Sequence, residues 1–206
     1  NVVGSTIARE AERCIYLHAG PEIGVASTKA FTCQVSVLLM LAVLFGRSRR
    51  LSRSEGLSVL NEVEKIPSLV NEIISRESMI EKAAEKFAKY EHAFYIGRGV
   101  LYPVALEGAL KLKEISYIHA EGYHAAELKH GPIALLGPDV PVVALAPQVA
   151  GYDKLLGNIQ ECRARKSPVL AIATDGDNEV MKMADSVIYL PPCSEYVIPV
   201  VTAVVL

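Results

Sequence analysis

From residue 92 onward, short apolar segments alternate with longer helical patterns, and this alternation constrains the fold more than any other feature. Strands are predicted at residues 93–96, 140–145, 169–173 and 187–190. Helices are predicted near residues 102–118, 124–130, 151–165, 177–184 and 194–206. Strands separated by helices form a parallel sheet that is covered on both faces. The expected fold class is therefore α/β, with doubly wound parallel sheets that bind ligands at the carboxyl ends of their strands.

The sequence before residue 92 is expected to contain one strand and several helices. A short strand is predicted at Cys14–His18 and a helix at 28–45, with Ser27 as its N-cap and Gly46 as its C-cap. A polar linker is predicted at 47–56. Further helices are predicted at residues 57–66, 67–75 (with Pro67 in its first turn) and 77–90.

This pattern predicts two related α/β lobes. Residues 1–46 would be the C-terminal part of the first lobe, 47–90 a linker with connecting helices, and 91–206 a second, C-terminally truncated lobe. Asn1-Val-Val-Gly has the pattern of a strand end, and the apolar segment 200–206 ends without a cap. We therefore expect the sequence to be a piece of a longer polypeptide.

Composition excludes several classes of function. The net charge of -2 gives no electrostatic basis for binding nucleic acid. The apolar run 35–45 is too short to cross a bilayer and predicts a buried core helix, so no membrane partner is expected. The four cysteines are widely separated, show no metal-ligand spacing, and indicate a reduced, cytoplasmic protein.

One predicted helix carries a line of charge on an otherwise apolar surface. At about 100° per residue, Glu107, Lys111 and Glu114 fall on one face. Ordinary ion pairs between neighbouring turns explain this spacing. A catalytic set of acids and a base explains it equally well, particularly because Lys129-His130-Gly131-Pro132 follows and adds an imidazole that can titrate near neutral pH. The spacing alone leaves both interpretations open.

Two long motifs resemble one known family. Residues 107–132, EGALKLKEISYIHAEGYHAAELKHGP, and residues 22–31, EIGVASTKAF, are similar to the isomerase domain of the glucosamine-6-phosphate synthase family, the glutamine–fructose-6-phosphate aminotransferases (isomerizing). The likeness extends over nearly the whole chain. It implies a tandem pair of sugar isomerase (SIS) domains.

The resemblance also implies an activity and its residues. Members of the family convert fructose 6-phosphate and glutamine-derived ammonia to glucosamine 6-phosphate, in the biosynthesis of amino sugars such as UDP-N-acetylglucosamine. By resemblance, Glu114 is the base, Lys111 assists proton transfer, Glu107 holds the sugar or Lys111, and His130 opens the sugar ring from a neighbouring subunit. A homodimer and an N-terminal glutaminase domain of the same polypeptide are therefore expected. No cofactor and no metal are expected.

The resemblance assigns substrate contacts to Val25 and Ser27, next to the start of the predicted helix 28–45. The turn Gly97-Arg98-Gly99 is explained by its tight geometry or by a phosphate contact. The turn 174–177 is too acidic for phosphate. Ala126 replaces a glycine that is frequent in the family, which would strain the loop if the backbone there required a positive φ.

Single histidines outside these motifs are expected to be structural. His18 and His92 are placed at strand edges, His124 has no evident partner, and His119 is expected to bond either the charged face or a buried carbonyl. Two alternatives to the aminotransferase remain open. They are a non-catalytic SIS regulator that binds a sugar phosphate, and a related phosphosugar isomerase or deglycase.

Overall fold

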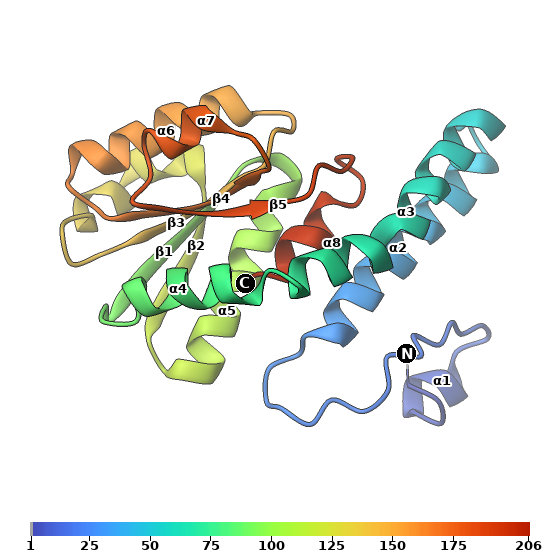
Figure 1. Cartoon of the computed structure of the whole chain (residues 1–206). Coiled ribbons are helices and arrows are strands. Elements are labelled where there is room, and N and C mark those ends of the chain that lie inside the picture. The colour runs from blue at the N-terminus through green and yellow to red at the C-terminus, as the bar shows by residue number, and fades with distance from the viewer. Residues whose placement is uncertain (1) are drawn as a thin grey trace. The chain divides into compact units, whose positions relative to one another are not determined.

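The computed structural model describes residues 2–206, which form two compact units, 2–61 and 62–206 (Figure 1). The described part of the first unit contains helices α1 (Thr6–Glu10) and α2 (Lys29–Arg47) and the start of α3 (Arg53–Ile74), and has no strand. The predicted strand Cys14–His18 was therefore wrong. A strand needs a hydrogen-bonded neighbour, and the described residues of this unit offer none.

Glu22, and not Ser27, caps the long helix α2. Its carboxylate accepts hydrogen bonds from the backbone N–H of Thr28 at 2.8 Å and of Ala30 at 3.0 Å. These bonds lower the pKa of Glu22, because they favour its charged form. The helix also continues past the predicted C-cap Gly46 and ends at Arg47. Both predicted caps were wrong.

Helix α2 is not the buried core helix that its apolar sequence predicted. Only Val43 is buried, because the first unit has no sheet among its described residues to cover the helix. The helix extends beyond the apolar run 35–45 at both ends, and its 19 residues are long and apolar enough, by length and composition alone, to cross a membrane. Core helices of soluble proteins pass the same test, so a single helix of this kind is weak evidence for a membrane span.

A single helix, α3, replaces two predicted helices and part of the predicted linker. Ser52 Oγ accepts from the N–H of Glu55 at 3.2 Å, and the carboxylate of Glu55 accepts from the N–H of Ser52 at 2.7 Å. This reciprocal pair is a capping box, a signal that the sequence carried. Pro67 lies inside the helix, where it removes one backbone hydrogen bond without ending the helix. Helix α4 follows at Glu77–Phe87.

The second unit is built on one five-stranded parallel sheet of order β2-β1-β3-β4-β5. The predicted strands are all present, and an unpredicted one, β2, pairs along its whole length with β1. The strands are β1 (His92–Gly97), β2 (His119–His124), β3 (Val142–Ala146), β4 (Val169–Thr174) and β5 (Ser186–Leu190). The order reverses between β1 and β3, as in doubly wound sheets.

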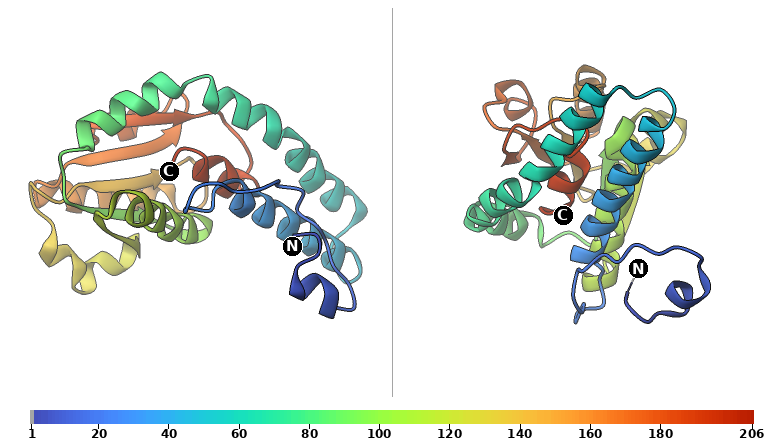
Figure 2. Two further views of the ribbon diagram at one scale, coloured as in Figure 1. Left: turned by 90° about the horizontal axis from the view of Figure 1, so that it is seen from below. Right: turned by 90° about the vertical axis from the view of Figure 1, so that its right-hand side faces the viewer.

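Helices cover both faces of this sheet, as predicted (Figures 1 and 2). One face packs against α4 and α5 (Tyr102–Ser116) and α8 (Ile198–Ala203). The other packs against α6 (Tyr152–Ala164), α7 (Asn178–Met181) and the short helix η2 (Ala125–His130). The remaining short helices are η1 (Gly99–Leu101) and η3 (Pro132–Leu135).

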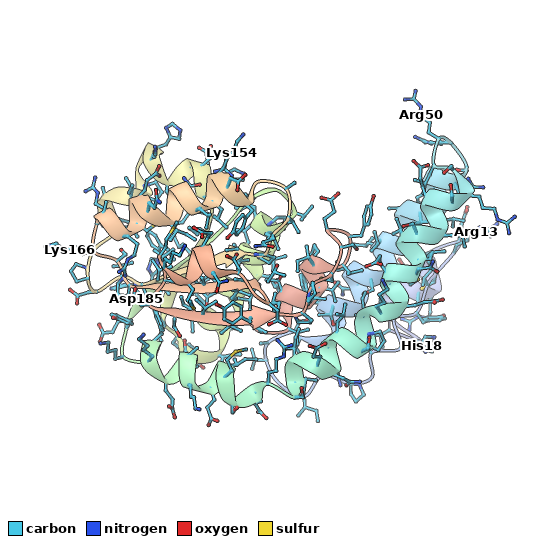
Figure 3. The ribbon with its side chains drawn as sticks, turned by 45° about the horizontal axis from the view of Figure 1, so that its top comes forward. Arg13, His18, Arg50, Lys154, Lys166 and Asp185 are labelled. Atoms are coloured by element: carbon cyan, nitrogen blue, oxygen red, sulfur yellow. The ribbon has the colours of Figure 1, made fainter. Side chains whose placement is uncertain are left out.

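Helix α6 shows how the sequence pattern places one side on the core. Leu155, Ile159 and Cys162 are buried against the sheet, whereas Lys154 points away from it (Figure 3). Two lobes, each with a parallel sheet, were expected. The described residues contain one such sheet, in the second unit. The predicted division at 1–46, 47–90 and 91–206 stays a prediction.

Helix α5 approaches strand β2 closely at Gly122. A Cβ atom at this position would lie 2.7 Å from the backbone of Leu106. We therefore expect Gly122→Ala to lower the free energy of unfolding by about 1–3 kcal/mol, because the helix would have to move away from the strand. Gly157→Ala on α6 is the control, since a Cβ there meets nothing within 4 Å. Urea unfolding that gives equal stabilities for both variants would contradict this close contact.

Candidate functional site

The three charged residues predicted to share a helix face lie together on α5. Lys111 Nζ is 2.8 Å from a carboxylate oxygen of Glu114 and 3.2 Å from one of Glu107. The residues lie three and four positions apart, so that consecutive turns of the helix bring them into contact. The predicted arrangement of this charged face is confirmed. Its catalytic role stays a prediction.

The ammonium group of Lys111 is the buried centre of the charged face. Its side chain is 10% exposed, against 17% for Glu107 and 31% for Glu114. Burial acts to lower the pKa of Lys111, but the hydrogen bonds to Glu114 and Glu107 outweigh it and raise the pKa above its ordinary value. Lys111 is therefore an ammonium group at neutral pH, a donor of hydrogen bonds and not a base.

The two carboxylates differ in their access to solvent. Glu107 lies mostly covered and serves to hold Lys111, whereas Glu114 is the more exposed of the pair. A molecule approaching this face of α5 would therefore meet the carboxylate of Glu114 first. Of the two carboxylates beside the Lys111 cation, Glu114 is the more accessible one, and its role as a base stays a prediction.

His130 ends the short helix η2, in a segment that the sequence placed partly in a helix and partly on a loop. The apolar side of η2 is anchored by Ala125 and Leu128, which are fully buried, while His130 is exposed. Gly131 follows with φ of 146°, and Pro132 begins η3. Within residues 2–206, His130 forms no hydrogen bond or ion pair with the charged residues of α5.

Ala126 fits its place in η2 without strain. The non-glycine residues that the structure shows with positive φ are His18, Tyr117 and Lys166, so Ala126 is not among them. The concern that alanine would strain this segment is therefore removed.

The turn Gly97-Arg98-Gly99 is explained by its geometry. A Cβ at Gly97 would lie 2.3 Å from the carbonyl oxygen of Leu101, and Gly99 has φ of 52°. The cavity beside Arg98 measures about 10 Å³, which holds at most one water molecule. The tight turn accounts for both glycines, and a phosphate contact at this turn stays a prediction. The acidic turn 174–177 serves α7, because Asp177 caps that helix through the N–H groups of Glu179 and Val180.

The predicted sugar contacts Val25 and Ser27 belong to the first unit. Val25 is 88% exposed and Ser27 is half-buried, in the segment that precedes α2. Glu22 in the same segment points its carboxylate at the start of the helix. Substrate binding by Val25 and Ser27 stays a prediction.

The remaining histidines have structural partners. His119 lies 3.5 Å from Glu121 and stacks edge-on against His92, so it does not bond the charged face of α5. His124 Nδ1 accepts a hydrogen bond from the N–H of Ala126 at 3.3 Å, which corrects the expectation that it has no partner. His18 has a positive φ of 53° in a segment without regular secondary structure, so it does not lie at a strand edge.

A large apolar cavity lies elsewhere in the second unit. It measures about 440 Å³ and lies between α4 and the sheet, with Phe87, Tyr95 and Leu112 in its wall. Of the charged residues on α5, none lines it. Its apolar walls do not suit a phosphorylated sugar, which needs polar partners. The described residues also contain no cluster of His, Cys, Asp or Glu able to hold a metal ion, and all four cysteines are free.

The sheet order and the charged helix beside it are those of a doubly wound α/β domain with a candidate site on one helix. The family described as SIS domain matches residues 1–44 and 86–206, and the chain belongs to this family. Over 99% of its length, the chain is 52% identical to a glutamine–fructose-6-phosphate aminotransferase (isomerizing) of Chlorobaculum tepidum, of which it covers 33%. It is 50% identical to the Methanosarcina mazei enzyme of the same name over its full length, covering 34% of that protein.

A solved structure agrees with this relationship. The C-terminal domain of glucosamine-fructose-6-phosphate aminotransferase from Francisella tularensis matches with a TM-score of 0.93 and 37% identity, over 100% of this chain and 58% of that one. The chain thus corresponds to the SIS portion of these aminotransferases. It spans about a third of the length of the curated relatives it matches.

Proposed function

We propose that this chain is the isomerase part of a glutamine–fructose-6-phosphate aminotransferase, which forms glucosamine 6-phosphate from fructose 6-phosphate and glutamine-derived ammonia. The observation that carries the proposal is Lys111 held as a cation between Glu107 and Glu114. The identity of about one half to aminotransferases over the whole chain supports it. The product enters the biosynthesis of UDP-N-acetylglucosamine.

The charged face supplies the proton transfer. Converting a ketose derivative into an aldose amine moves a proton between C1 and C2, which requires a base beside both carbons. Glu114 is this base, because its carboxylate is the more accessible of the two. The ammonium of Lys111 stabilises the negative charge that develops on the neighbouring substrate oxygen. Glu107 keeps Lys111 in place and charged.

His130 opens the ring of the sugar as a general acid–base group. It is exposed at the end of η2 and free of partners on α5, which fits a group that serves a neighbouring subunit in a homodimer. Val25 and Ser27 contribute to sugar binding. The reaction uses no metal and no cofactor, and the ammonia comes from an N-terminal glutaminase domain of the same polypeptide.

The polypeptide is proposed to act in the cytoplasm, where reducing conditions fit its four free cysteines. The division into 1–46, 47–90 and 91–206 is retained as part of this proposal, with the first segment contributing Val25 and Ser27. A non-catalytic regulator would need a sugar-phosphate pocket but not the charged set on α5. The joint presence of Glu107, Lys111 and Glu114 therefore favours the enzyme.

A direct assay tests the proposal. The complete polypeptide is incubated with fructose 6-phosphate and glutamine, and glucosamine 6-phosphate is quantified by mass spectrometry. We expect catalytic turnover. Binding of fructose 6-phosphate without any amino sugar would reject the enzyme in favour of the regulator. Turnover of another phosphosugar in preference would favour the related isomerase or deglycase.

A further inference from the structure

A chain of polar contacts connects the carboxyl end of β1 to the turn that carries His130. Arg98 Nη1 donates to the side-chain oxygen of Asn158 at 2.7 Å. The side-chain nitrogen of Asn158 donates to one carboxylate oxygen of Glu161 at 3.2 Å. The other oxygen of Glu161 lies 2.8 Å from Nζ of Lys129, the residue before His130. One carboxylate oxygen of Glu161 therefore contacts Asn158 and the other contacts Lys129.

The centre of this network is buried and has a fixed polarity. Asn158 is 6% exposed, and a buried amide needs partners for both its oxygen and its nitrogen. Its oxygen faces the guanidinium of Arg98 and its NH₂ group faces the carboxylate of Glu161. The flipped amide would set oxygen against carboxylate, so the charges at the two ends select one orientation.

The network contacts the C-terminal end of η2, which is exposed and lacks apolar packing against the core. Leu128 anchors the inner side of η2 in the core, whereas Lys129 and His130 are exposed. Without the ion pair to Glu161, nothing polar in the described residues ties this exposed end to α6. The apolar contacts of Leu128 hold η2 against the core, and the ion pair between Lys129 and Glu161 holds the exposed end of η2 against α6.

We propose that Arg98, Asn158 and Glu161 are positioning residues, which hold Lys129 and thereby orient His130 for ring opening. The inference rests on the proposed function, because it assigns these residues to the step that His130 performs. An acid–base group held in the productive geometry reacts faster than one that must find it. The network should therefore influence turnover and leave substrate binding unchanged.

The test uses Glu161→Gln in the complete polypeptide. We expect kcat to fall about threefold to fivefold, the range of an ion pair with one exposed partner, with KM for fructose 6-phosphate unchanged. Lys129→Met should have the same effect, Lys129→Arg should retain activity, and the double variant should be no worse than either single one. Glu179→Gln is the matched control, because it removes a comparable ion pair, with Lys182 at 2.6 Å, away from the turn.

Amide hydrogen exchange of residues 126–131, measured in the same variants, reports on the turn without any substrate. Faster exchange together with the lower kcat supports the network. Unchanged kcat in Glu161→Gln, or a loss that is simply additive with Lys129→Met, would overturn it. If the unmodified polypeptide makes no glucosamine 6-phosphate but Glu161→Gln still speeds exchange at the turn, the proposed function fails and the network stands.

Discussion

Glu114→Gln in the complete polypeptide is expected to lower the rate of glucosamine 6-phosphate formation by about 10²–10⁴-fold, the contribution of a positioned base. Glutamine has the size of glutamate and can still accept a hydrogen bond from Lys111, which lies 2.8 Å from the carboxylate. Only the ability to take a proton is removed. Binding of fructose 6-phosphate, measured by calorimetry, should therefore remain.

The control for this variant is Glu81→Gln, which changes an exposed glutamate of α4 in the same way. It should turn over like the unmodified enzyme. Turnover of Glu114→Gln at the unmodified rate would remove Glu114 from the mechanism. Loss of both binding and turnover would indicate a structural role for this carboxylate.

Mixing two inactive variants is expected to restore activity if His130 serves the neighbouring subunit. In a heterodimer of His130→Ala and Glu114→Gln chains, one site then carries both lesions and the other carries neither. Activity should return to about half of the unmodified level per heterodimer, because one of two symmetric sites is intact. The measurement is glucosamine 6-phosphate formation after subunit exchange, with heterodimers quantified by native mass spectrometry.

The same mixing experiment gives the opposite result if the site is not shared between subunits. If His130 acts within its own subunit, every site in the heterodimer keeps one lesion and mixing restores nothing. Each variant exchanged with itself controls for reactivation by the exchange procedure. Heterodimers without activity would reject the shared site and leave the role of His130 to a single subunit.

The sequence by itself determined the features that depend on local periodicity. The charged face of α5 follows from the helical repeat, which brings Glu107, Lys111 and Glu114 together whatever surrounds the helix. Strands β1, β3 and β4 were predictable because they are buried on both faces and read as apolar runs. The capping box at Ser52 and Glu55 was equally local and could have set the start of α3.

Only the tertiary structure decided strand β2 and the burial of α2. The β2 sequence, HAEGYH, is mostly polar, and it becomes a strand because β1 offers it a continuous row of hydrogen-bonding groups. The apolar sequence of α2 suits a core helix, but its burial depends on what packs against it. Secondary-structure propensity is a property of one segment. The formation of β2 and the exposure of α2 depend instead on which elements lie beside them in the folded chain.

The tertiary structure also decided how the surroundings of His130 are held. Lys129 and Glu161 are 32 positions apart, and Arg98 and Asn158 are 60 apart, so no local pattern links them. They meet because η2 and α6 pack on one face of the sheet next to the end of β1, which brings their side chains and Arg98 within hydrogen-bonding distance. The sequence therefore determined the charged face of α5, whereas the packing of the sheet determined which residues contact Lys129 beside His130. Hydrogen bonds form between spatial neighbours regardless of their separation along the chain.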